Sequence, residues 1–174
     1  MSAIDNTPEN RNFLSPLDFQ FSIKKAPNVN FFIQKVNIPS IDLKAANTPN
    51  PFVSTPYPGE HLTFGMLNIT FKVDEDLQNY LELYNWLNAL GKPKNFNQYL
   101  SIEQQPSYSG NGIYSDISVV ALTSRKIPNY EVLYRDAFPV SLSAVEFNTT
   151  AVDVNYITAS AKFRYTYFTL TQVT

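Results

Sequence analysis

The side chains that could carry chemistry in this 174-residue chain are few. The only histidine, His61, follows Pro58-Gly59-Glu60, and no G-x-S-x-G or comparable turn supplies a nucleophile for it to activate. The chain has no cysteines, which excludes thiolate chemistry, disulfides and a cysteine-based zinc site. We therefore predict that the protein is not an enzyme, that it has no catalytic residues and that His61 lies in a surface loop.

Two other patterns could bind ions. Asp74-Glu75-Asp76 lacks the alternating ligand spacing of a calcium loop and directly precedes a predicted helix, where acidic residues cap free N–H groups. Ser109-Gly110-Asn111-Gly112 has no preceding strand and no following lysine, so it favours a turn over a phosphate-binding loop. We predict no metal, no cofactor and no cofactor-binding residues.

One α-helix is predicted from about Leu77 to Leu90, and Gly91 followed by Pro93 forms its stop signal. Its apolar residues recur at helical spacing, which places Tyr80 and Tyr84 in the core. Trp86 falls outside this stripe and could face another subunit. The stripe consists of Leu77, Tyr80, Leu81, Tyr84, Leu87 and Leu90.

Alternating apolar and polar residues predict strands over most of the remaining chain. The first two are expected to form a hairpin, Pro139 is expected to separate two later strands, and the last segment is expected to be one long strand. The pattern predicts a mainly β fold, a β-sandwich or barrel of about seven strands with one flanking α-helix. The predicted strands cover residues 17–23, 32–38, 67–73, 117–122, 130–138, 141–147 and 156–170.

The segment from Pro39 to Glu60 contains five prolines, which fix φ and remove backbone donors. It is predicted to be a loop of about 20 residues, and loops of that length are usually functional or disordered. Its apolar residues, Phe52 and Val53 among them, favour a loop that docks on another surface. Residues 1–12 are predicted to form a flexible arm, and residues 13–174 a single β domain.

The composition favours self-association over nucleic-acid binding. The 13 Phe and 11 Tyr exceed what one core readily houses, and aromatic residues are enriched at protein interfaces. The predicted edge strands also lack the proline and lysine residues that protect a solitary sheet. A net charge of −2 argues against a protein that grips phosphates.

Short basic groups interrupt this weakly charged sequence. Lys24-Lys25 and Arg125-Lys126 are expected to be solvated turn residues, and with Lys162 and Arg164 they could instead line a contact with an acidic partner. The N-terminus does not resemble a secretory signal, and no apolar run approaches the roughly 20 residues that span a bilayer. We expect a protein of an aqueous compartment with no membrane contact.

The order of these segments resembles the tail tube proteins of contractile-tailed bacteriophages. The matching features are Val36-Asn37-Ile38-Pro39, the long proline-rich segment, and a strand that runs through Asp74-Glu75 into Leu83-Tyr84-Asn85-Trp86-Leu87. Asp136-Ala137-Phe138-Pro139 and the closing Phe163-Arg164-Tyr165-Thr166-Tyr167 complete the order. The resemblance extends from about Phe13 to Leu170.

This resemblance implies hexameric rings that stack into a hollow tube in the virion tail. The tape measure and then DNA would pass through the tube without specific binding, and tail sheath and baseplate or neck proteins would be further partners. Assembly would take place in the host cytoplasm, with the segment from Pro39 to Glu60 stacking ring on ring. Related tubes occur in type VI secretion systems.

Three other functions are compatible with the sequence. The chain could be a tube-end paralogue, either a terminator or a baseplate initiator. A carbohydrate-binding β-sandwich would use exposed tyrosines and Trp86 as a stacking platform. A hydrolase that depends on His61 is the third alternative.

Overall fold

The computed structural model describes residues 13–91, 97, 99–100, 112–149 and 156–173. The predicted arm at residues 1–12 and the predicted turn residues 109–111 lie outside these ranges. The elements in chain order are β1 (Phe19–Ile23), α1 (Pro27–Phe32), β2 (Ile33–Val36), β3 (Ile41–Thr48), β4 (Thr55–Phe64), β5 (Leu67–Lys72), α2 (Gln78–Gly91), β6 (Ser115–Leu122), β7 (Pro128–Leu142), β8 (Thr158–Arg164) and β9 (Tyr167–Gln172).

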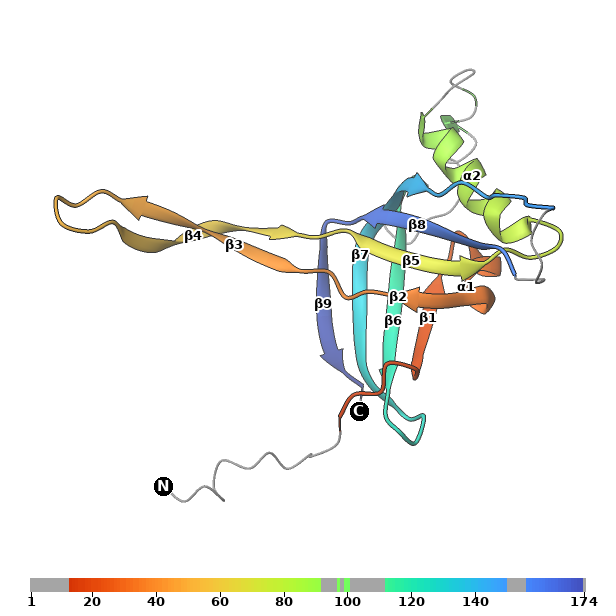
Figure 1. The fold of residues 1–174 in the computed structure, drawn as a ribbon, viewed down its shortest axis with the longest axis horizontal. Coiled ribbons are helices and arrows are strands. Elements are labelled where there is room, and N and C mark those ends of the chain that lie inside the picture. Colours follow the sequence, from red (N-terminus) through yellow and green to blue (C-terminus); the bar gives the residue numbers. More distant parts are fainter. Residues whose placement is uncertain (1–12, 92–96, 98, 101–111, 150–155, 174) are drawn as a thin grey trace.

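Seven strands form one bent sheet, which divides into two layers that share β7. The first sheet has the order β1-β6-β7-β9, and the second sheet has the order β7-β8-β5-β2. The strands of one sheet run across those of the other (Figure 1). The predicted mainly β fold with the helix near Leu77 to Leu90 is confirmed, with α1 as a second, unpredicted helix.

Strand β7 makes the corner between the two sheets. Its first part, from Tyr130 to Arg135, pairs with both β6 and β9, and its last part, from Phe138 to Leu142, pairs with β8. Asp136 lies between these parts with a φ of 54°, a left-handed conformation that turns the strand. The prediction that Pro139 ends the strand was wrong, because Pro139 lies at a register shift where the ladder with β8 is interrupted.

The core lies between the facing sides of the two sheets. Side chains alternate along each strand, so Leu67, Ile69 and Phe71 of β5 point inward while Asn68 points to solvent. Burying each large apolar side chain contributes about 1.5–3 kcal/mol. The other large buried side chains are Ile23, Val29, Leu83, Ile117, Val132, Tyr134 and Phe163.

Helix α2 packs on the core through a different face from the predicted one. Its buried residues are Asn79, Leu83, Trp86 and Ala89, whereas Tyr84 is 48 % exposed. Trp86 is only 4 % exposed, donates its Nε1–H to the carbonyl of Ile113 at 3.0 Å and contacts Phe163 with ring centroids 6.1 Å apart. The placement of Tyr84 in the core and of Trp86 at a subunit contact was therefore wrong.

Polar contacts at the start of α2 explain why the helix is rotated about its axis relative to the prediction. The side chain of the buried Asn79 donates to the carbonyl of Lys72 at 2.7 Å, which ties the first turn to the end of β5. The backbone N–H of Asn79 also donates to the carboxylate of Asp74 at 3.4 Å. These polar contacts set the face that α2 presents to the core, and Asp74 lies at the helix start as predicted.

The first two strands do not form the predicted hairpin. The six-residue helix α1 lies between them, with Pro27 in its first turn, where a missing N–H is tolerated. Strand β1 pairs with β6 in the first sheet, and β2 pairs with β5 in the second. Helix α1 therefore carries the chain from one sheet to the other.

The segment from Pro39 to Glu60 is not a loop but most of a hairpin formed by β3 and β4, which projects from the body (Figure 1). Pro56 pairs with Asn47 and Pro58 with Ala45. Prolines are compatible with this ribbon because each of its two strands has an open edge, where no backbone donor is needed. The sequence pattern missed the hairpin because proline usually excludes an internal strand.

The predicted long strand at residues 156–170 is divided between the two sheets. Ala159, Ala161 and Phe163 of β8 face the core. The chain turns after Arg164 and returns as β9, which pairs with β7 in the first sheet. Tyr165 and Tyr167 thus do not continue the apolar face of β8.

We predict that Trp86→Ala lowers the free energy of unfolding by about 3–5 kcal/mol, because it leaves a cavity against Phe163. Trp86→Phe should cost about 1–2 kcal/mol, since the carbonyl of Ile113 loses its donor. Tyr84→Ala on the exposed face of the same helix should change stability by less than about 0.5 kcal/mol. Urea unfolding of the three variants measures these values, and a larger loss for Tyr84→Ala would contradict this helix orientation.

Lys25 should make the stability of the fold depend on pH. Its buried Nζ lies 5.2 Å from the ring centroid of Trp86 and has no hydrogen-bond partner in the described part of the chain. Burial lowers the pKa of Lys25 from 10.5 to about 8. The prediction of a solvated turn was therefore wrong for this residue.

Between those two pKa values the unfolded chain binds a proton at Lys25 that the folded protein has lost. The free energy of unfolding should therefore rise as the pH increases from about 8 to 9.5. Lys25→Met should abolish that rise, and Lys24→Met, with the same loss of charge, should retain it. Burial raises the pKa of Tyr134 and Tyr165, so their opposing effect begins only above about pH 10. Equal slopes in both variants would refute this role of Lys25.

Candidate assembly surfaces

The structure brings no catalytic group together around His61. His61 is exposed on β4, in the hairpin rather than in a loop, and its side chain makes no hydrogen bond or ion pair with any described residue. Within the described ranges no three His, Cys, Asp or Glu side chains are close enough to hold a metal ion, the group at Asp74 to Asp76 included. No described helix is long and apolar enough to cross a membrane. The surfaces that remain are candidates for contact with other proteins.

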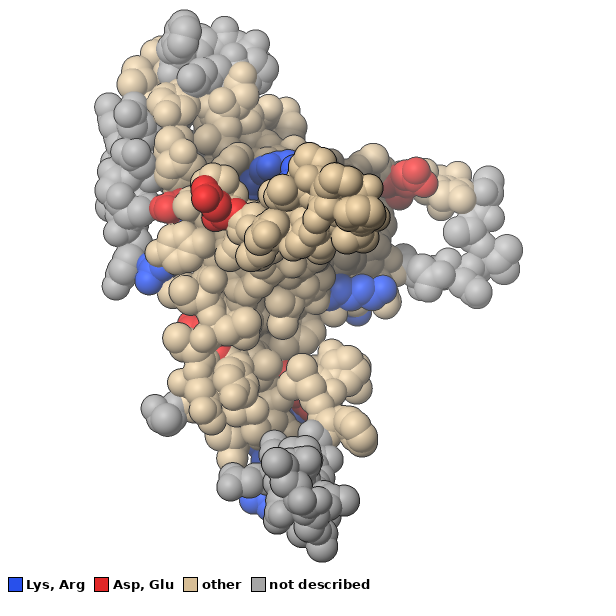
Figure 2. All heavy atoms as spheres, turned by 90° about the vertical axis from the view of Figure 1, so that its left-hand side faces the viewer, with Lys and Arg blue, Asp and Glu red and all other residues tan. Residues whose placement is uncertain are grey.

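The hairpin of β3 and β4 exposes a large apolar surface. At its tip Phe52 is 96 % exposed, and Val53 and Tyr57 are also largely open to solvent. The sequence from Ala45 to Gly59 carries no charge, and in Figure 2, which looks along the hairpin toward the body, most of this surface is uncharged. Exposed apolar surface of this kind marks a site of protein contact.

The base of the hairpin is fixed to the body by close packing. Gly59 lies at a register shift opposite Lys44, and a Cβ at this position would clash with the carbonyl oxygen of Lys44. Phe64 contacts Phe168 and Tyr165, with ring centroids 5.6 and 6.0 Å apart, and both rings contact the buried Tyr134. This aromatic cluster joins the hairpin to both sheets, so the position of its tip depends on the core.

Both ends of the first sheet lack a strand partner. The outer edges of β1 and β9 pair with no other described strand, and neither strand contains proline or lysine. Asn30 covers only the end of β1, where its side-chain amide exchanges hydrogen bonds of 2.9 and 3.2 Å with the backbone of Ile23. By contrast, β2 at the end of the second sheet carries Lys35 and a register shift, features that protect an edge.

The two open edges have matching polarity. Each neighbouring pair along β1-β6-β7-β9 is antiparallel, so β1 and β9 also run in opposite directions. If two copies were placed side by side, β9 of one and β1 of the other would therefore meet as an antiparallel pair. Such a pair would continue the sheet across the junction without changing its pattern.

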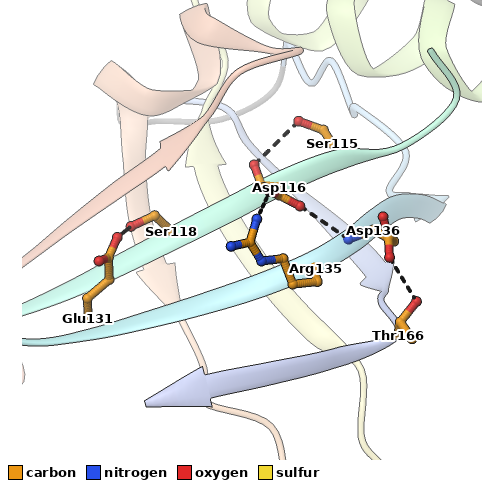
Figure 3. Close-up of polar contacts among 7 residues, drawn as sticks. All are labelled: Ser115, Asp116, Ser118, Glu131, Arg135, Asp136 and Thr166. Carbon is orange, nitrogen blue, oxygen red and sulfur yellow. Dashed lines mark hydrogen bonds and ion pairs between the residues drawn. The ribbon is translucent and has the colours of Figure 1, made fainter. Parts of the chain in front are cut away.

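The solvent face of the first sheet carries one ion pair and an excess of carboxylates (Figure 3). Arg135 forms an ion pair with Asp116, whose other carboxylate oxygen accepts the backbone N–H of Asp136 at 3.3 Å. The hydroxyl of Ser118 donates to Glu131 at 2.6 Å. With three carboxylates and one guanidinium, this face is weakly negative.

The solvent face of the second sheet is basic, and we call it the basic face. It carries Lys35, Lys72, Lys162 and Arg164, and no Asp or Glu occurs in β2, β5 or β8. Lys35, Lys162 and Arg164 are exposed, and the Nζ of Lys72 lies 3.7 Å from the ring centroid of Tyr156. The sequence offered Lys162 and Arg164 as contact residues for an acidic partner, and the strand register adds Lys35 and Lys72.

One comparison with known proteins identifies a family. A family model described as phage tail tube protein matches residues 6–171. A search of curated protein sequences found no match.

Two solved structures align over nearly the full length. The tube-terminating cap of the anti-feeding prophage has a TM-score of 0.66 at 12 % identity, with 99 % of this chain and 100 % of that chain covered. A chain of the PVC sheath–tube complex, an extracellular contractile injection system in its extended state, has a TM-score of 0.65 at 15 % identity, with 99 % of each chain covered. At these identities the similarity shows a shared fold.

A chain of the anti-feeding prophage baseplate has the same fold over 88 % of this chain and 90 % of its own length, with a TM-score of 0.58 at 13 % identity. The family match spans almost the whole described molecule, including the hairpin and both sheets. The chain therefore belongs to the phage tail tube protein family, and its role is a structural one of the tube type rather than an enzymatic one.

Proposed function

We propose that this chain is the repeating subunit of a tail tube, with six copies in each ring and rings stacked into a hollow conduit. The observation that carries the proposal is that one sheet ends in two unguarded edges of opposite direction. A heterologous contact between unlike edges closes into a ring when its rotation is a simple fraction of a turn. The solved relatives come from a sheath–tube complex and a tube cap, which supports this kind of assembly.

The first sheet would form the continuous part of each ring. Strands β1 and β9 have five and six residues, so they can pair along almost their full length. Their outward N–H and C=O groups would gain partners in the neighbouring copies. Exposed edges that invite aggregation in a monomer would thereby become the specific contact between subunits.

The hairpin would stack one ring on the next. It projects beyond the body, its tip is apolar, and its uncharged surface can be covered without desolvating a charge (Figure 2). The aromatic cluster around Phe64 holds its base in place. Residues 13–174 would act as one unit in this assembly, with residues 1–12 as an accessory arm.

The assembled tube would be the path of the tape measure and of DNA. The weakly negative face of the first sheet suits the inner wall of the tube. DNA would slide along this wall without specific binding, because phosphate binding needs clustered cations. Sheath, baseplate and neck proteins would be the other partners of the tube in the virion tail. The host cytoplasm is the expected place of assembly.

A tube-end paralogue is the second candidate, because the prophage cap and the sheath–tube chain match this fold equally well. Labelled subunits along the whole tail would support the repeating subunit, and label only at the neck or baseplate would support the paralogue. The carbohydrate-binding alternative loses Trp86 from its stacking platform, because Trp86 is buried.

Leu170→Pro tests the ring contact. The N–H of Val173 donates to the carbonyl of Asn129, and alternation along the ladder turns the N–H of Leu170 away from β7. Proline at this edge position should therefore leave the fold cooperative while it removes a donor from the ring contact and abolishes rings. Leu170→Ala keeps the N–H and should form rings. Analytical ultracentrifugation and electron microscopy provide the measurements, and rings in Leu170→Pro would exclude β9 pairing.

Shortening the hairpin tests the stacking contact. Asp42 and Thr63 are directly paired, and the hydrogen bond from the N–H of Gly65 to the carbonyl of Ser40 makes them a hydrogen-bonded pair by alternation. Asn-Gly in place of residues 43–62 should therefore close the shortened hairpin with a two-residue turn. We expect a folded chain that forms single rings but no tubes.

A point variant supplies the matched comparison for stacking. Phe52→Ser should weaken tube formation at least about tenfold, because it removes an apolar side chain from a contact. Phe147→Ser, at another phenylalanine that is 78 % exposed but lies outside the hairpin, should not. Tubes of normal length from the shortened chain would show that the hairpin does not stack the rings.

A further inference from the structure

The two sheets expose solvent faces of opposite charge. The first sheet presents Asp116, Glu131 and Asp136 with a single cation, Arg135, and the ion pair to Asp116 already satisfies that cation. The basic face presents four cations, and no carboxylate of the described residues forms an ion pair with any of them. In a chain with a net charge of −2, four unpaired cations on one face are a local excess.

The cations are placed to act together. Lys162 and Arg164 alternate on β8, and Lys162 lies directly across from Asn68 of β5. Lys35 lies opposite Thr70 on the other side of β5. Lys72 extends over the ring of Tyr156, a contact that holds its charge at the end of the same strand. Three strands in fixed register therefore carry one positive surface whose uncharged positions are Asn, Thr and Ser.

The proposed ring fixes which way this surface points. If β1 and β9 join the copies, the first sheet is the continuous layer, and the second sheet covers its opposite side. The two solvent faces then look to opposite sides of the tube wall. A basic lining would bind the phosphates of DNA along the whole tube, whereas the weakly negative face of the first sheet would not.

We propose that the basic face points outward and is the docking surface for an acidic protein layer that surrounds the tube. The proposal rests on the proposed function, because it needs the ring to separate an inside from an outside. The complementary surface would present Asp and Glu side chains to Lys35, Lys162 and Arg164. Electrostatic matching of this kind selects the partner and sets its register on the tube.

The test uses tubes assembled from the purified chain and a poly-glutamate peptide, either free or coupled to beads too wide to enter the tube. We expect the beads to bind the tubes at low salt. Lys162→Ala combined with Arg164→Ala should weaken this binding about tenfold, because two exposed ionic contacts are lost. Arg125→Ala combined with Lys126→Ala removes the same charge from the exposed β6–β7 turn and should weaken binding less than about twofold.

Each other outcome overturns the proposal. Equal losses in the two double variants would show that net charge, and not this face, attracts the peptide. Binding of free peptide that depends on Lys162 and Arg164, without binding of beads, would place the basic face in the lumen. If the beads do not bind at all, the basic face is not a docking surface for an acidic protein. Micrographs of the same samples show whether tubes form, so a failure of the proposed function is seen separately.

Discussion

Backbone hydrogen bonding at the two ends of the first sheet is the constraint on which the other features depend. A buried or half-buried strand needs partners for its N–H and C=O groups, and β1 and β9 find one on a single side only. The remaining described strands do not pair with the outer edges of β1 and β9. Strand β2 pairs in the second sheet, and β3 and β4 pair with each other in a hairpin that leaves the body. The chain thus forms a closed core, while the first sheet keeps an unpaired edge at each end.

The corner in β7 links the core to the surfaces. Because this strand passes through Asp136 from one sheet into the other, the facing sides of both sheets enclose Tyr134, Ile69 and Phe163. The same corner places the two solvent faces on opposite sides of the molecule. Phe64 and the rings around it then connect the hairpin to this corner. The edges, the two faces and the hairpin are therefore held in one fixed arrangement.

The sequence predicted the features that depend on local pattern. The alternation in residues 67–73 and 117–122 gave β5 and β6, and the helix was correct to within about a residue at each end. The rotation of α2 could not be predicted, because the polar contacts of Asn79 with Lys72 and Asp74 outweigh a stripe of leucines and tyrosines. The hairpin was missed because proline is excluded only from strands paired on both sides, and sequence does not show which edges are open.

Of the candidate assembly surfaces, the sequence located only the segment from Pro39 to Glu60. An excess of aromatic residues and unguarded edges indicated self-association, while the identity of those edges depends on pairing between distant segments such as β1 with β6. The basic face likewise depends on the register between β5 and β8, which joins Lys72 and Lys162 from segments about 90 residues apart. Long-range pairing of this kind leaves no local signal in the sequence.

Electron cryomicroscopy of assembled tubes, at a resolution that traces individual strands, tests the central claim most directly. The account predicts that β9 of each copy lies antiparallel to β1 of its neighbour, so that the first sheets form one continuous layer around the ring. Rings in which the edges of β1 and β9 face solvent, or in which the second sheet forms the continuous layer, would contradict it.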